Sequence, residues 1–145
     1  MNALAKKAAL IAAILLISSF CRAQKLEPGN LIGLHVVTVN LNPNVTMDEF
    51  TNAFVHQVLP EYEKNWPGLK GYLVKSFFKD SKHKFAIIWL FKTVDDRNRN
   101  FDANDRANEL EKAALEKVKP VEEELKKQYG SYTVEYTHED DWVVQ

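Results

Sequence analysis

Histidine is the side chain whose ordinary pKa lies nearest neutral pH, and this chain has four: His35, His56, His83 and His138. No two of them are four residues apart, so the sequence predicts no helix face that pairs two histidines as metal ligands. His35 and His138 fall in segments expected to form strands, and only the fold can bring them together. A hydrogen-bonded structural role is favoured for both, and both remain candidates for ligand binding or proton transfer.

Sequence motifs that indicate a chemistry by themselves are missing from the chain. It contains no P-loop and no G-x-G-x-x-G, H-E-x-x-H or G-x-S-x-G segment, and its five glycines are scattered. The acidic run 138–141 lacks the alternating ligands of a calcium loop. The run 95–100, with Arg97 and Arg99, is interpreted as a solvated first helical turn, in preference to an anion site or part of a cleft mouth. The sequence therefore predicts no metal site and identifies no catalytic residue.

The N-terminal residues have the three regions of a secretory signal peptide. Lys6 and Lys7 precede the uncharged apolar run 8–20, which is too short to span a bilayer. The segment Cys21-Arg22-Ala23 then places small side chains at the two positions that a signal peptidase reads. We therefore expect residues 1–23 to be a signal peptide and cleavage to follow Ala23.

Export is the expected consequence, either to a periplasm or to the extracellular medium. Lipidation at Cys21 is a less favoured alternative, because bulky Phe20 stands where a lipoprotein signal has a small residue. Cleavage after Ala23 leaves a mature chain without cysteine, hence without a disulfide or a thiolate ligand. Residues 24–32 are then expected to form a short leader before a single domain at 33–145.

The charge of the mature chain restricts its partners. The full chain has 19 basic and 20 acidic residues, and loss of Lys6, Lys7 and Arg22 with the signal peptide leaves a net charge of −4. A weakly acidic protein lacks the basic footprint that nucleic-acid binding requires. It also lacks the basic patch that holds a protein on anionic lipid. We expect no nucleic-acid partner and no membrane partner after signal cleavage.

The composition of the rest is that of a globular domain, with 46% hydrophobic and 27% charged residues in the whole chain. Thr46 and Glu49 fit a capping box at a helix start. Pro60 is expected to kink or split this helix, and Lys119-Pro120 to kink or restart a second one. The expected elements are a strand at 34–41, a helix from Thr46 to Trp66, strands at 69–79 and 84–93, a helical region at 95–129, and a strand at 131–138.

This β-α-β-β-α-β order predicts the α+β fold known as ferredoxin-like, in which two helices cover one face of a four-stranded antiparallel sheet. Side chains of the strand 84–93 alternate between the two faces. Small and aliphatic side chains suit close helix packing, so they are expected on the helix side and the aromatic set on the open face. The first set is Ala86, Ile88 and Leu90, and the second is Phe85, Ile87, Trp89 and Phe91. An apolar open face most simply packs against a second copy, so a sheet-to-sheet homodimer is expected.

The element order, the apolar strand that enters a helix through Phe91-Lys92-Thr93-Val94-Asp95-Asp96, and the aromatic set resemble the dimeric α+β barrel superfamily over about residues 33–138. This superfamily includes the antibiotic-biosynthesis-monooxygenase-like and stress-responsive barrel proteins. The resemblance implies sheet-to-sheet pairing and a cleft between sheet and helices in each subunit.

Haem-degrading members have an axial histidine on the second helix, an asparagine on the first strand and a tryptophan near the end of the third. The chain has Asn40 and Trp89 at such positions but no histidine between His83 and His138. No haem and no other cofactor is therefore expected. Cofactor-independent quinone-forming members need only an apolar cleft and a few polar groups, which Tyr72 and Tyr136 can supply together with Asn40 and Trp89.

The expected function is the binding of an apolar or aromatic small molecule in that cleft by an exported dimer. The alternatives are a cofactor-independent monooxygenase-like enzyme and a purely structural or interaction dimer whose aromatic face is used up in assembly. A sizeable pocket that touches Trp89 or Asn40 would favour the first two over the third. The candidate ligand-binding residues are His35, Asn40, Tyr72, Trp89, Phe91, Tyr136 and His138.

Overall fold

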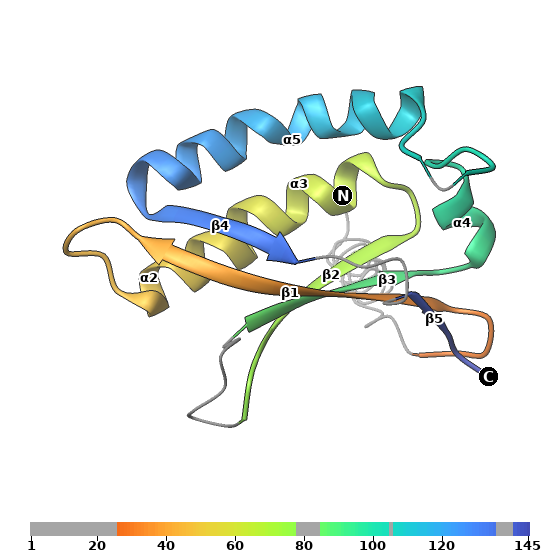
Figure 1. The fold of residues 1–145 in the computed structure, drawn as a ribbon, viewed down its shortest axis with the longest axis horizontal. Coiled ribbons are helices and arrows are strands. Elements are labelled where there is room, and N and C mark those ends of the chain that lie inside the picture. The colour runs from red at the N-terminus through yellow and green to blue at the C-terminus, as the bar shows by residue number, and fades with distance from the viewer. Residues whose placement is uncertain (1–25, 78–84, 105, 136–140) are drawn as a thin grey trace, which may run out of the picture.

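In the computed structural model, the long helices cover one face of an antiparallel sheet (Figure 1). The structure describes residues 26–77, 85–104, 106–135 and 141–145, so the expected signal peptide lies outside the described residues. No helix in these ranges is long and apolar enough to cross a membrane. The elements are β1 (Leu31–Leu41), α2 (Met47–Ala53), η1 (Phe54–Val58), α3 (Leu59–Asn65), β2 (Leu69–Lys75), β3 (Phe85–Phe91), α4 (Val94–Asn98), α5 (Glu109–Gln128), β4 (Gly130–Glu135) and β5 (Asp141–Val143).

The described strands form one five-stranded antiparallel sheet in the order β2-β3-β1-β4, with β5 also paired to β1. β1 is central, because β3 pairs with one of its edges while β4 and β5 pair with different parts of the other. β4 joins β1 at Val36–Leu41, and β5 joins it at Leu31–Gly33. The α+β class and the antiparallel sheet expected from the sequence are confirmed, whereas the strand β5 was not predicted.

Local sequence signals determine the first helical segment. Thr46 caps α2 by accepting the amide of Glu49, whose carboxylate accepts the amide of Thr46, so the predicted capping box is confirmed. The chain passes through the π-helical turn η1 before Pro60, which occupies the first turn of α3. The amide of Leu59 donates to the carbonyl of Phe54, five residues earlier, so the helix changes its hydrogen-bond spacing just before the proline that lacks an amide. The backbone stays helical from η1 into α3, so the helix expected to kink or split at Pro60 is not split and has a π-helical turn instead.

The second helical region contains two helices. α4 is short, and Asn108 caps α5 by accepting the amides of Leu110 and Glu111. α5 continues through Pro120, so the restart predicted at this residue is wrong. Pro120 lies on the exposed side of α5, where water can satisfy the carbonyl that proline leaves without an amide partner.

The two sets of side chains on β3 lie on the faces opposite to those predicted. Phe85 and Ile87 lie in one core cluster with Phe50 and Phe54 of the first helical segment. Phe91 lies in a second cluster, which includes residues of α5. The aromatic set of β3 thus faces the helices, and the opposite face carries Ala86, Ile88 and Leu90. Alternation along the strand separates the two sets of side chains but does not say which set faces the helices. The aromatic set faces them because large side chains are needed to fill the space between a twisted sheet and helices.

Candidate functional site

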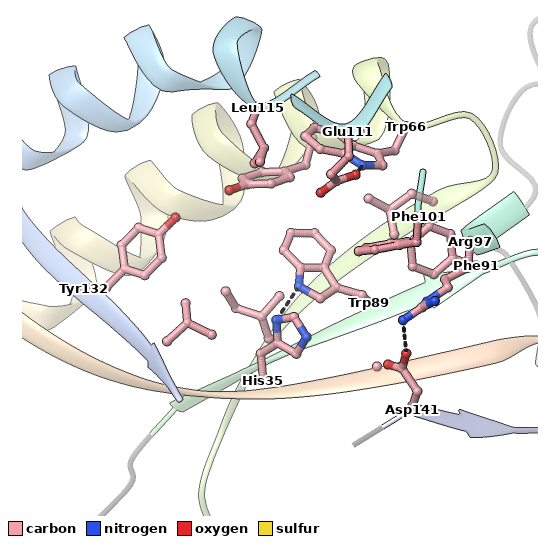
Figure 2. A pocket seen from close by; sticks show the side chains of 15 residues that line it. His35, Trp66, Trp89, Phe91, Arg97, Phe101, Glu111, Leu115, Tyr132 and Asp141 are labelled. Atoms are coloured by element: carbon pink, nitrogen blue, oxygen red, sulfur yellow. Dashed lines mark hydrogen bonds and ion pairs between the residues drawn. The ribbon is translucent and has the colours of Figure 1, made fainter. Parts of the chain in front are cut away.

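A cavity of about 290 Å³ lies between the sheet and the helices, on the helix side of β1 and β3 (Figure 2). Its walls are mainly aromatic and aliphatic, and a few ionisable side chains reach its edges. The lining residues are Gly33, His35, Tyr62, Trp66, Leu69, Ile87, Trp89, Phe91, Arg97, Phe101, Glu111, Leu115, Tyr132, Val134 and Asp141.

Trp89 forms the floor of the cavity because glycines flank it on both neighbouring strands. The register pairs Trp89 with Gly33 of β1 and with Gly71 of β2. A Cβ at Gly71 would lie 2.8 Å from the indole and 2.8 Å from a methyl of Leu59, so only glycine leaves the ring its present position. The indole packs beneath Tyr62, with ring centroids 4.9 Å apart. The two glycines therefore allow a large ring to lie across three strands.

His35 extends from β1 beside this floor and is connected to it by a hydrogen bond. The indole N–H of Trp89 donates to Nδ1 of His35 at 3.1 Å, and the two rings meet edge to face (Figure 2). Since Nδ1 accepts, the proton of the neutral imidazole lies on Nε2. The hydrogen bond thus selects one tautomer and holds the imidazole in one orientation.

Arg97 and Asp141 form the polar end of the cavity. Arg97 is 7% exposed, contacts a carboxylate oxygen of Asp141 at 3.2 Å, and lies over the ring of Phe101 at 4.1 Å from its centroid (Figure 2). The interpretation of residues 95–100 as a solvated turn is therefore wrong for Arg97 and Asn100, which are buried, although Arg99 is exposed as expected. Helix α4 turns Arg97 toward the sheet, where the strand pairing of β5 has placed Asp141.

Glu111 borders the cavity from the first turn of α5. Its carboxylate accepts the indole N–H of Trp66, which follows α3. Burial raises the pKa of the Glu111 carboxyl, while the hydrogen bond from Trp66 and the positive charge of Arg97 act in the opposite direction. Among the described residues, Glu111 has no ion-pair partner within 4 Å.

Two tyrosines close the other end of the cavity by sharing one acceptor. The hydroxyls of Tyr62 and Tyr132 both donate to the same carboxylate oxygen of Glu122, the former at 2.8 Å. Burial and then the charge of Glu122 raise the pKa of Tyr62, and burial is also the main cause of the raised pKa of Tyr132. Both phenols therefore stay neutral throughout the physiological pH range.

The candidate residues predicted from the sequence fall into three groups. His35, Trp89 and Phe91 line the cavity. Asn40 and Tyr72 do not line it, since both alternate with helix-facing neighbours and lie toward the other face of the sheet. Tyr136 and His138 are outside the described residues. Within the described ranges, no group of three His, Cys, Asp or Glu side chains is arranged to hold a metal ion.

Sequence reasoning missed the polar groups of the cavity, namely Tyr62, Arg97, Glu111, Tyr132 and Asp141. Arg97 belongs to a charged run that is typical of a surface, and Asp141 to an acidic run near the C-terminus. The signal that could have found Tyr62 and Glu111 is their position on the apolar sides of their helices. No local pattern links Asp141 to Arg97, because β5 brings them together only through its pairing with β1.

Comparisons of the chain with models of known protein families, with curated proteins and with solved structures give no match. The properties of the cavity itself must therefore indicate its chemistry. Enclosing one aromatic ring, which buries about 150 Å² of apolar surface, contributes about 4 kcal/mol before the entropy of association is subtracted. The polar groups at the two ends are then placed to orient such a ligand.

Proposed function

We propose that this protein binds a small apolar or aromatic molecule in the cavity between its sheet and its helices. The observation that carries the proposal is the cavity of about 290 Å³ with aromatic walls, because the interiors of proteins are close-packed and have few voids larger than a water molecule. Ligand sites are usually concave and largely apolar, with a few polar groups that determine orientation. The volume is at the small end of the usual range for such sites, which suits a ligand of one or two rings.

The purely structural alternative fits the cavity less well. That alternative requires the aromatic residues to be used up in packing, yet Trp66, Trp89 and Phe91 all retain a surface on the cavity. The monooxygenase-like alternative adds turnover to the same binding step. Oxygen consumption with a hydroquinone as the substrate tests it separately.

Filling the cavity tests the proposal, with 2-naphthol as the neutral aromatic probe. Leu115 lines the cavity from α5, and Leu110 lies on the same helix outside it; both side chains are partly exposed, so each position can accept a larger side chain. We expect the native protein to bind 2-naphthol with a dissociation constant on the order of 100 μM by isothermal calorimetry. Leu115→Trp should weaken binding at least about tenfold, and Leu110→Trp should leave it unchanged. Absence of binding, or equal binding by both variants, would refute the proposal.

We further propose that the chain belongs to the dimeric α+β barrel superfamily and pairs through the open face of its sheet. The strand order β2-β3-β1-β4 with the helices on one face supports this assignment. The register places Leu34, Ile88 and Tyr72 side by side on the opposite face, where Leu34 and Tyr72 are 37% and 41% exposed. Light scattering should report a dimer that Leu34→Arg converts to a monomer. A native monomer at micromolar concentration would refute the pairing.

Export remains our proposal for the location of the protein. It is supported by the order of Lys6-Lys7, the apolar run 8–20 and Cys21-Arg22-Ala23. The intact mass of the protein recovered from its own host should correspond to a chain that begins at Gln24. A mass that includes Met1 would refute cleavage, and a lipid adduct on Cys21 would show that the less favoured alternative is correct.

A further inference from the structure

We infer that the ligand of this cavity is an aromatic or aliphatic amine in its protonated form, whose ammonium group contacts the carboxylate of Glu111 while its apolar body lies against Tyr62 and Trp89. The inference rests on the proposed binding function and names the chemical class of the ligand. It follows from the balance of charge among the described lining residues, the ion pair that already engages Arg97, and the aromatic rings beside Glu111.

The charges that line the cavity do not balance. Its titratable lining residues are His35, Tyr62, Arg97, Glu111, Tyr132 and Asp141. Arg97 and Asp141 form an ion pair with each other, and His35 accepts at Nδ1 as a neutral imidazole. The two tyrosines donate to Glu122 as neutral phenols. The carboxylate of Glu111 is therefore the charge without a counterion among the described lining residues, and Glu122 adds a second negative charge behind the tyrosines.

An anionic ligand would meet an unfavourable field in this cavity. The guanidinium of Arg97 is engaged by Asp141 at 3.2 Å and by the face of Phe101 at 4.1 Å. A ligand carboxylate near Arg97 would lie close to the carboxylates of Asp141 and Glu111, and like charges at short range repel strongly in a poorly solvated site. Arg97 and Asp141 therefore form an ion pair with no net charge in the cavity wall, and not a binding site for an anion.

Aromatic rings are grouped where the positive end of an amine would lie. Trp66 donates its indole N–H to Glu111, so this carboxylate lies at the edge of the indole. Tyr62 stacks on Trp66 with centroids 5.1 Å apart and contacts Trp89 at 4.9 Å. The negative faces of aromatic rings attract ammonium groups, most strongly where water is excluded. Three connected rings beside an unbalanced carboxylate form the combination that recognises an organic cation.

The protonation behaviour of Glu111 agrees with this arrangement. Burial raises the pKa of its carboxyl, because the hydrogen bond from Trp66 and the charge of Arg97 do not fully compensate the ionised form for its loss of water. An ammonium group in contact with the carboxylate would supply that compensation. Binding of the cation and ionisation of Glu111 should therefore favour each other.

Three matched probes test the inference: 2-phenylethylamine, 2-phenylethanol and 3-phenylpropionate, which share a phenyl ring on a two-carbon chain. The proteins are the native protein, Glu111→Gln and Glu109→Gln. Glutamine at position 111 can still accept the indole N–H of Trp66, and Glu109 is a highly exposed residue of the same helix. Affinities are measured by isothermal calorimetry at pH 7, with folding of each variant checked by circular dichroism.

The native protein should bind the amine at least about tenfold more tightly than the alcohol or the carboxylate, about 1.4 kcal/mol. Glu111→Gln should abolish this preference and retain binding of the alcohol, while Glu109→Gln should keep the preference. Equal binding of the three probes, or tighter binding of 3-phenylpropionate, would overturn the inference and leave the binding function intact. Failure of the native protein to bind any of the three probes would overturn the inference, and failure to bind 2-naphthol as well would overturn the binding function.

A second measurement needs no variant. Carbon-13 NMR of the Glu111 carboxyl in the native protein should show a lower pKa when 2-phenylethylamine saturates the cavity than when 2-phenylethanol does. A pKa that is the same with both probes would overturn the contact between the ammonium group and Glu111.

Discussion

Replacement of Gly71 by alanine tests whether glycine determines the position of Trp89 and hence the floor of the cavity. The added Cβ would lie 2.8 Å from the indole of Trp89 and 2.8 Å from a methyl of Leu59. Carbon atoms pack without strain at about 3.5–4.0 Å, so at least one of these side chains has to move by several tenths of an ångström. Leu59 is buried and Trp89 contacts Tyr62, so neither can move without disturbing its neighbours.

Two opposing effects decide the change in the free energy of unfolding. Overpacking of this kind costs about 1–3 kcal/mol. Alanine lowers the conformational entropy of the unfolded chain, which offsets about 0.5–1 kcal/mol of that cost. We expect Gly71→Ala to lower the free energy of unfolding by about 0.5–2 kcal/mol in urea titrations, because the overpacking term is the larger.

Gly33→Ala is the matched control, since it makes the same change on the opposite side of the same indole. There a Cβ would meet a carboxylate oxygen of Asp141 at 3.0 Å and the Cβ of Trp89 at an ordinary 3.7 Å. The indole N–H resonance of Trp89, which reports its hydrogen bond to His35, should shift in Gly71→Ala and stay nearly unchanged in Gly33→Ala. Native stability together with an unshifted resonance in Gly71→Ala would refute the reasoning, as would an equal shift in both variants.

Further perturbations address other parts of the site and the fold. Glu122→Ala removes the acceptor of two half-buried tyrosine hydroxyls and should cost about 1–3 kcal/mol in urea unfolding, whereas exposed Glu123→Ala should cost little. Burial in the folded state raises the pKa of Glu111 above its value in the unfolded chain, which is about 4.3. The protonated carboxyl therefore stabilises the folded state below about pH 4.3, and this stabilisation is lost as the pH rises through the pKa that Glu111 has in the folded protein. Glu111→Gln should therefore reduce the decline in unfolding free energy across that pH window, and an unchanged pH profile would contradict the raised pKa. Thr46→Ala removes the side-chain cap of α2 and should lower the free energy of unfolding by about 1 kcal/mol, and no change would show that the cap does not contribute to stability.

Elements whose cause is local could be predicted from the sequence. The capping box at Thr46 and Glu49 places the start of α2, and Pro60 marks the place where the helix becomes irregular. The β-branched run of β1 and the apolar run of β3 are strands in the structure, as expected. Such signals act within a few residues of the chain, so they need no knowledge of the rest of the fold.

Part of the candidate site was also predictable. His35 was selected as a histidine on a strand, and Trp89 and Phe91 were selected as aromatic residues of the apolar third strand; all three line the cavity. The alternation of side chains along that strand could not tell which face the helices cover. It therefore put Trp89 and Phe91 on the open face. Tyr72, which was selected as a polar group for a cleft, lies away from the cavity.

The sequence by itself determined the composition, the α+β class, and the two alternating sets of side chains on each predicted strand. Only the tertiary structure decided which set faces the helices and which charges meet at the cavity. The pairing of β5 with β1 brings Asp141 to Arg97, and the packing of α5 against α3 brings Glu111 to Trp66. The physical reason is distance along the chain, because contacts between residues tens of positions apart depend on how all the elements pack together and leave no local pattern.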